Sequence, residues 1–334
     1  MPVMSEGDYR YNKLMAAFPS LPEPAFETAE MQELVWGRRW GCATDVGRLR
    51  AVLVHRPGFE IKVVDPDKYI AEIGAFGDVE KGWYWRGPEP PDLQKMQSQH
   101  DALVKVLHDE GVEVIRLEPP APGRTKSCSP RDAMVAVDGG AIVCRLGARI
   151  RRGEELPVTR TLARVGMPIL RTVHGTGILE GGSFAWLNRR TAVVGLGTRA
   201  NAEGARQLEE VLRTQGVELC RVQLPGYRQH LDGLFVMIDV DTALVNPTLV
   251  PYALLEKLTE LRIRTIDLHP EDSPFTINCL AVRPGRVLMS ESSPYTLERL
   301  AKEGIEVVSL EFEAVYRGGG GIHCSTAPLQ RDPV

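Results

Sequence analysis

Residues 232–247 read DGLFVMIDVDTALVNP, two apolar runs separated by a short polar segment. This pattern is typical of a β-hairpin, in which two antiparallel strands flank a tight turn. The same layout occurs at residues 132–145, 183–196 and 278–290, with Asp-Gly, Asn-Arg and Pro-Gly at the centres. Turn residues of this kind at four equivalent places predict a repeated hairpin unit.

Helical segments extend this unit. The second, third and fourth hairpins are followed by such segments at residues 201–216, 250–261 and 294–304. Two of them end at Gly216 and Gly304, as helices often do, and a short apolar strand then follows each helix. An earlier unit fits loosely, with a strand at residues 49–58, a long insertion, a helix at 92–111 and a strand at 112–117. The chain therefore reads as about five ββαβ units.

The turns recur at intervals of roughly fifty residues, a period typical of radial or solenoid repetition. A ring of such units would bring equivalent positions together at its centre, whereas an ordinary α/β sheet with similar units by chance would not. We expect residues 1–40 to be an N-terminal extension and residues 41–334 to be a single α/β domain. Residues 60–91 are an insertion within it.

The amino-acid composition and net charge limit the kinds of binding partner to be expected. The 334 residues are 43% hydrophobic and 25% charged, which is ordinary for a globular protein. A formal net charge of −4 gives no basic footprint, so we expect no nucleic-acid partner. No apolar run is long enough for a membrane helix, and the N-terminal residues lack the pattern of a signal peptide. We expect a cytoplasmic protein without a membrane partner.

The cysteine pattern singles out one residue. Six cysteines are scattered without Cys-x-x-Cys pairs or zinc-ligand spacing, so we expect no metal. In a reducing compartment most of them read as small buried hydrophobes. Cys324 instead follows His323 and the four glycines of residues 318–321, a run that is costly in conformational entropy. A frayed tail is one interpretation; we predict a buried, ordered loop, because the apolar Pro328 and Leu329 follow.

Polar residues begin the first strand of each hairpin: Asp132, Ser183, Asp232 and Asn278. In a ring these positions would converge, with Glu180 and His230 just upstream of two of them. A thiol and a histidine are a common pair in covalent catalysis, and grouped carboxylates call for a cationic ligand such as a guanidinium. Taken singly, each residue has another interpretation, such as a surface ion pair for Asp132 or a core histidine for His230.

The motifs resemble those of the guanidino-group-modifying enzymes, the pentein superfamily: arginine deiminase, dimethylarginine dimethylaminohydrolase and the amidinotransferases. Five stretches within residues 41–332 carry the resemblance: LRAVLVHRPG, PRDAMVAVDGG, LEGGSFAWL, HLDGLFVMID and the glycine-rich end with HCSTAPLQR. The resemblance implies a five-bladed, pseudo-symmetric α/β propeller of ββαβ units around a central active-site channel. It also implies a small guanidino substrate and no cofactor, while a homo-oligomer stays open.

Roles follow from the resemblance for three residues that match the family's catalytic positions. Cys324 corresponds to the nucleophile that attacks the guanidino carbon. His230 corresponds to the general acid and base, and Glu180 to the carboxylate that supports it. The chain departs from the deiminases at Ser183, where they usually have an aspartate, which weakens the expected contacts to the guanidinium.

Four further residues match substrate-binding positions of the family. Asp132 and Asp232 correspond to the aspartates that hold the guanidinium nitrogens. Arg151 and Arg199 lie nineteen residues after Asp132 and Glu180, respectively, and match arginines that hold the substrate α-carboxylate.

The motifs allow more than one type of reaction. The HLDGLF stretch and the Cys-x-x-x-Pro-Leu-x-Arg ending favour a hydrolase acting on arginine or an arginine derivative through a covalent thiouronium intermediate. An amidinotransferase is the alternative, followed by a propeller that only binds guanidino compounds. Residues 75–91 read either as a lid over the pocket or as a surface loop with Trp83 and Trp85 packed beneath it.

Overall fold

The computed structural model describes residues 3–20, 28–120 and 123–334. Five three-stranded sheets of one design make up most of it. In each, the middle strand pairs antiparallel with one neighbour and parallel with the other. Four of these sheets are formed by consecutive strands: β6 (Met134–Val137), β7 (Gly140–Val143) and β8 (Ile169–Thr172); β9 (Phe184–Asn188), β10 (Thr191–Leu196) and β11 (Glu218–Gln223); β12 (Phe235–Asp239), β13 (Thr242–Val245) and β14 (Arg264–Asp267); β15 (Leu280–Arg283), β16 (Arg286–Ser290) and β17 (Glu306–Leu310).

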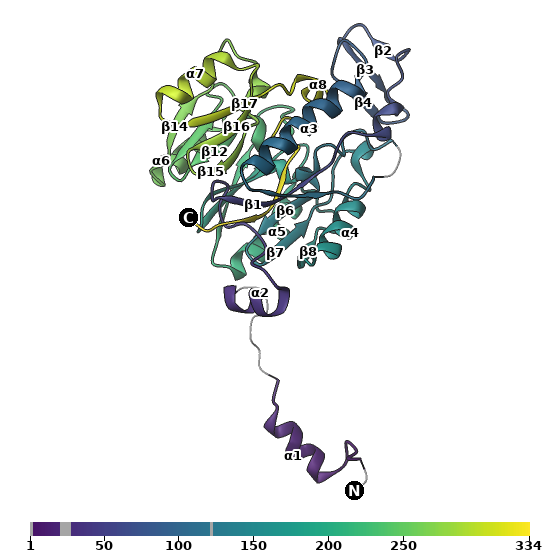
Figure 1. The fold of residues 1–334 in the computed structure, drawn as a ribbon, viewed down its shortest axis with the longest axis vertical. Coiled ribbons are helices and arrows are strands. Elements are labelled where there is room, and N and C mark those ends of the chain that lie inside the picture. The colour runs from purple at the N-terminus through teal and green to yellow at the C-terminus, as the bar shows by residue number, and fades with distance from the viewer. Residues whose placement is uncertain (1–2, 21–27, 121–122) are drawn as a thin grey trace.

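The fifth sheet joins the two ends of the domain. β1 (Leu49–Val54) lies between β5 (Glu113–Arg116), with which it is parallel, and β18 (Ala327–Arg331), with which it is antiparallel. Figure 1 shows the yellow C-terminal strand beside the purple β1. The predicted C-terminal strand is therefore present, and residues 321–329 are all buried. The glycine-rich end is not a frayed tail.

A helix connects the parallel strands in each sheet, because parallel neighbours need a crossover. These helices are α3 (Leu93–Asp109), α4 (Glu155–Val165), α5 (Ala202–Thr214), α6 (Tyr252–Glu260) and α7 (Pro294–Lys302). In α5 the Asn201 side chain accepts a hydrogen bond from the Gly204 N–H at the start, and Gly216 follows the end with φ +70°. The four helices predicted from the sequence are confirmed, and α4 adds a fifth.

The α/β class is thus confirmed. The sheets are separate, and no sheet closes on itself within the described ranges. Short 3₁₀ turns lead into the first strand of four sheets: Pro130–Ala133, Gly181–Ser183, Leu231–Gly233 and Pro274–Ile277. Each turn contacts the next one along the chain. The four positions therefore lie at turns that are each in contact with the next, and two of them, Asp232 and Asn278, line the cavity described below.

The insertion folds into a sheet of its own. A 3₁₀ turn, Phe59–Val63, is followed by an antiparallel sheet of β2 (Tyr69–Ile70), β3 (Ala75–Asp78) and β4 (Trp83–Trp85). The alternation in β4 buries Trp83 and Trp85, which are 4% and 1% exposed. Tyr84 points the other way and is half-buried. The insertion is anchored by its tryptophans and turns Tyr84 and the following Arg86 toward the rest of the molecule.

The N-terminal helices differ in their packing. α1 (Tyr9–Ala17) buries none of its side chains and lies apart from the sheets in Figure 1, whereas α2 (Ala29–Trp36) lies close below them. A short α8 (Glu313–Tyr316) packs against α3 and leads into the glycine run. None of the helices formed by the described residues is long and apolar enough to cross a membrane.

Candidate active site

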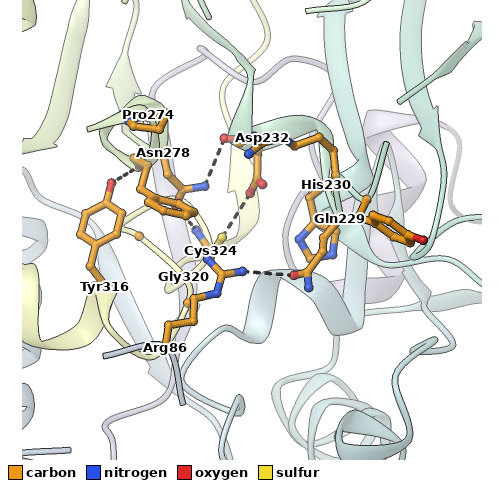
Figure 2. A pocket seen from close by; sticks show the side chains of 15 residues that line it. Arg86, Gln229, His230, Asp232, Pro274, Asn278, Tyr316, Gly320 and Cys324 are labelled. Atoms are coloured by element: carbon orange, nitrogen blue, oxygen red, sulfur yellow. Dashed lines mark hydrogen bonds between the residues drawn. The ribbon is translucent and has the colours of Figure 1, made fainter. Parts of the chain in front are cut away.

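Cys324 lies in a cavity of about 330 Å³ that is lined in part by two of the 3₁₀ turns, Leu231–Gly233 and Pro274–Ile277. His230, Asp232 and Asn278 line the same cavity, as do Gly320 and Arg86. Figure 2 shows Cys324 at the back, with Asp232 and His230 on one side and Asn278 and Tyr316 on the other. Four of the residues singled out in the sequence, Cys324, His230, Asp232 and Asn278, therefore share one cavity.

The Cys324 thiol is held by two contacts. Its Sγ lies 3.3 Å from Oδ2 of Asp232, and its backbone N–H donates to Oδ1 of Asn278 at 3.0 Å. Burial and the negative charges of Asp232 and Asp132 raise the pKa of this thiol well above its usual value. The sulfur is therefore a protonated thiol that donates to a carboxylate, and it becomes nucleophilic only when that negative field is offset.

The glycine run permits the close packing around this thiol. A Cβ on Gly320 would lie 2.5 Å from Oγ of Ser129 and 3.0 Å from Cβ of Cys324. A Cβ on Gly321 would lie 2.6 Å from Oδ1 of Asn278, the same atom that accepts the Cys324 N–H. No side chain fits at either position without moving the thiol or its partner. The glycines are thus explained by close approach rather than by looseness.

His230 is joined to a buried carboxylate. Its Nε2 lies 2.7 Å from Oε2 of Glu180, and its Nδ1 lies 3.7 Å from Oδ1 of Asp132. Burial opposes protonation of the imidazole, but Asp132 and the hydrogen bond to Glu180 outweigh it and raise the pKa of His230 to about 9. His230 is therefore a cation at neutral pH and holds a proton that it can donate.

Glu180 is itself fully buried and well satisfied. It accepts hydrogen bonds from the Gly147 N–H at 2.9 Å and from Nη1 of Arg199 at 3.2 Å, in addition to His230. Burial opposes ionisation, yet His230, Arg151 and Arg199 hold the pKa of Glu180 well below its usual value. Glu180 is thus a permanent negative charge that orients the imidazole.

Asp132 and Arg151 form an ion pair with each other and do not line the cavity. Nη1 of Arg151 donates to Oδ2 of Asp132, while its Nε and Nη2 donate to Glu154 at 3.1 and 2.8 Å. Neither Asp132 nor Arg151 lines the cavity, and Arg199 does not line it either. In this structure Asp132 and Arg151 therefore pair with each other and Arg199 pairs with Glu180, while their role in substrate binding stays a prediction.

Asp232 has a partner that the sequence pattern did not assign. Its Oδ2 accepts a hydrogen bond from Nδ1 of His323 at 2.8 Å, and its backbone carbonyl accepts one from Nδ2 of Asn278 at 3.2 Å. Burial opposes ionisation of Asp232, but the hydrogen bond from His323 lowers its pKa to about 2. The one local signal for His323 was its place beside Cys324; Asn278 could be anticipated from its position in the repeat.

Asp132, Glu180 and His230 also form a group that has the donors of a metal site, with ligand atoms within 4.8 Å of one another. These donors already serve other partners, since Arg151 and the Gly182 N–H occupy Asp132, and Arg199 occupies Glu180. The arrangement fits an internal network of charges better than a vacant set of ligands.

A protein-family model described as N,N dimethylarginine dimethylhydrolase, eukaryotic, matches residues 89–331. The chain belongs to this family. Dimethylarginine hydrolases and arginine deiminases are both among its relatives, which confirms the superfamily that the motifs indicated. Like these relatives, the chain is a hydrolase that acts on C–N bonds of linear amidines.

Two relatives, a dimethylarginine hydrolase and an arginine deiminase, show how similar the chain is to each of these groups of enzymes. An N(G),N(G)-dimethylarginine dimethylaminohydrolase from Streptomyces coelicolor is 30% identical over 232 residues, covering 70% of this chain and 85% of that protein. An arginine deiminase from Mycoplasma capricolum is 22% identical over 404 residues, covering 87% and 97%, respectively. The similarity to the dimethylarginine hydrolase is thus higher but spans less of this chain.

A solved structure of a dimethylarginine hydrolase shares the fold. It is a mutant of the enzyme from Pseudomonas aeruginosa complexed with citrulline, and it superimposes with a TM-score of 0.67 at 22% identity. The match covers 84% of this chain and 99% of that one. Family members of this kind therefore share nearly the whole of their fold with this chain.

Proposed function

We propose that this chain hydrolyses the guanidino group of L-arginine or of an arginine derivative through a covalent intermediate on Cys324. One observation carries the proposal: Cys324, His230 and the ionised Asp232 line a single cavity, and Glu180 holds the imidazole from behind. A thiol, an acid and a carboxylate in one hollow match what attack on a cationic guanidino carbon requires.

Binding prepares the nucleophile. Asp232 holds two nitrogens of the planar guanidinium, as carboxylates do in bidentate pairs. Asp132, 3.7 Å from Nδ1 of His230, supplies a second negative charge at the imidazole. The guanidinium brings a positive charge beside the sulfur and offsets the field of Asp232. The Cys324 thiol then loses its proton to solvent and becomes a thiolate.

Chemistry follows in two stages. The thiolate of Cys324 forms an S–C bond to the guanidino carbon, and protonated His230 gives its proton to the leaving nitrogen as the C–N bond breaks. Ammonia or an alkylamine departs and a thiouronium remains on the sulfur. Neutral His230 then takes a proton from water, whose oxygen bonds to the carbon. The S–C bond then breaks, and the O–H proton of the adduct is lost as the sulfur leaves and is reprotonated to the thiol. This releases a ureido product, the class to which the citrulline bound by the solved relative belongs.

The same proposal includes the architecture. We infer that the five three-stranded sheets are the blades of a pseudo-symmetric propeller, with the 3₁₀ turns at its axis, residues 1–40 outside it and residues 41–334 forming it. The shared strand order of the sheets and the contacts between successive turns support this arrangement. A cytoplasmic location is part of the proposal, supported by six free cysteines in the described ranges.

The test is incubation with arginine, methylated arginines and agmatine, with and without an acceptor amine. Hydrolysis releases ammonia or an alkylamine without any acceptor, and Cys324→Ser abolishes the release. Cys220→Ser, at a half-buried thiol outside the cavity, is the matched control and retains activity. Product formation only in the presence of an acceptor would instead indicate an amidinotransferase, and turnover that survives Cys324→Ser would rule out the covalent route.

A further inference from the structure

Arg86 is a cation that projects into the cavity from the insertion. Figure 2 shows its guanidinium between Gly320 and Gln229, in front of Cys324. Nη2 of Arg86 lies 3.5 Å from Oε1 of Gln229, and its guanidinium carbon lies 5.0 Å from the centre of the Phe275 ring. These contacts hold the side chain in place, and both are to uncharged groups: among the described residues, no carboxylate forms an ion pair with Arg86.

The other arginines predicted to bind a carboxylate are already paired. Arg151 forms ion pairs with Asp132 and Glu154, and Arg199 forms one with Glu180. Freeing either one would leave a buried carboxylate without its partner, which costs several kcal/mol. Arg86 can bind an anion without this cost, because no existing ion pair has to be broken.

The region around Arg86 is positively charged. Lys126 is buried, its Nζ lies 4.3 Å from the centre of the Tyr84 ring, and it donates to the carbonyl of Gly318. Burial alone would raise the pKa of the Tyr84 phenol, yet Lys126, Gln229, Arg199 and Arg86 lower it to about 7. An environment that favours a phenolate this strongly also favours a carboxylate.

The glycine run makes room for these cations as well as for the thiol. A Cβ on Gly319, where φ is +104°, would lie 3.2 Å from Nε of Arg86 and 3.4 Å from Nζ of Lys126. Gly320, the next residue, approaches Cys324. Neighbouring Cα atoms are about 3.8 Å apart, so this short segment touches the cations on one side and the nucleophile on the other. The cavity thus has an acidic end at Asp232 and a basic end at Arg86.

We propose that Arg86 binds the carboxylate of the substrate and so selects guanidino acids over guanidino compounds that lack a carboxylate. The inference rests on the proposed function, because it takes the guanidinium to lie at Asp232. Arg228 also lines the cavity, but its side chain is exposed, so its charge is screened by solvent. Specificity for the acid therefore comes from the insertion and not from Arg151.

The experiment compares Arg86→Gln with the parent protein on a guanidino acid and on its decarboxylated counterpart, such as arginine and agmatine. Hydrogen bonds between charged groups contribute about 1.5–3 kcal/mol. Arg86→Gln should therefore raise KM for the acid on the order of 10- to 100-fold with a smaller change in kcat, and lower the ratio of kcat/KM for the acid to kcat/KM for the decarboxylated compound by a similar factor. Arg86→Lys recovers part of the loss. Arg213→Gln, at an exposed arginine on α5, is the matched control.

Calorimetry with Cys324→Ser and with the double variant Cys324→Ser/Arg86→Gln measures binding independently of turnover. We expect the acid to bind more tightly than the decarboxylated compound, and Arg86→Gln to remove that preference. Equal losses for both compounds, or no change for the acid, would overturn the role of Arg86. Absence of turnover by the parent protein with every guanidino compound would refute the proposed function alone, because the binding preference is still measured.

Discussion

Replacing Glu180 by glutamine tests how the imidazole is tuned. Glu180 is 0% exposed and accepts hydrogen bonds from Nε2 of His230, Nη1 of Arg199 and the Gly147 N–H. The amide keeps the size of the side chain but removes the negative charge. A hydrogen bond to a charged group contributes about 1.5–3 kcal/mol, and one pKa unit corresponds to about 1.36 kcal/mol.

The pKa of His230, about 9 in the native protein, should therefore fall in Glu180→Gln to roughly 7 to 8. Because protonated His230 is the proposed acid, kcat should decline above its pKa, and the basic limb of the pH profile should move down by one to two units. The assay is kcat from pH 6 to 10, with imidazole proton resonances as a direct measure of the pKa.

The free energy of unfolding should also depend on pH through His230. A histidine whose pKa is raised in the folded state stabilises it fully below the unfolded pKa of about 6.5, and this contribution is lost as the pH rises through about 9. In Glu180→Gln this dependence becomes smaller, and overall stability falls by about 3–5 kcal/mol because Arg199 loses its buried partner. Glu298→Gln, at an exposed carboxylate paired with Lys302, is the control. A basic limb that stays near pH 9 in Glu180→Gln would refute the proposed link between Glu180 and His230.

Three further predictions concern the packing and the thiol. Gly320→Ala should destabilise the fold by about 1–3 kcal/mol and lower turnover, because the added methyl group displaces Cys324. Gly233→Ala is the control and should keep the urea midpoint of the parent protein, because a Cβ there meets nothing within 4 Å. Equal urea midpoints for the two variants would contradict this prediction. Trp85→Ala should cost about 3–5 kcal/mol in urea unfolding because this buried ring anchors the insertion, and a loss below about 1 kcal/mol would show that it does not. Alkylation of Cys324 by iodoacetamide in the free protein, measured against Cys324→Ser, should stay slow up to pH 9, since its thiol pKa is raised; fast alkylation at pH 7 would disprove a protonated thiol.

Much of the fold could be predicted from local pattern. The stretch at residues 183–196 forms β9 and β10, with Ala185 opposite Val193, because apolar runs around turn residues leave few other options. The helix α4 is not evident in the sequence because the arginine-rich segment at residues 149–152 and Pro157 obscure its start, and no side-chain cap marks it. For residues 75–91 the sequence suggests a lid or a surface loop, whereas the structure has the strands β3 and β4 there; the alternation Trp83-Tyr84-Trp85 is the pattern of a strand.

The site shows a different limit of sequence reasoning. Cys324, His230 and Asp232 lie together as expected, because each belongs to a motif fixed at the start of a strand or at the end of the domain. Spacing also singled out Asp132 and Arg151, but spacing does not distinguish opposite charges that share a ligand from opposite charges that bind each other. The structure pairs them. Arg86 went unnoticed because nothing local sets it apart from other arginines; its significance comes from the tryptophans that orient its strand.

The charges of the site explain why a guanidinium is needed to form the nucleophile in the proposed reaction. Without substrate, Asp232 accepts a hydrogen bond from the Cys324 thiol, and its negative charge keeps that thiol protonated and unreactive. A bound guanidinium takes over the carboxylate and cancels its charge at the sulfur, so the thiolate forms only when its target is in place. His230 needs no such trigger, since Asp132 and Glu180 already keep it protonated. The nucleophile is therefore controlled by the ligand and the acid by the protein, and a neutral isostere of the guanidinium should bind without producing a thiolate.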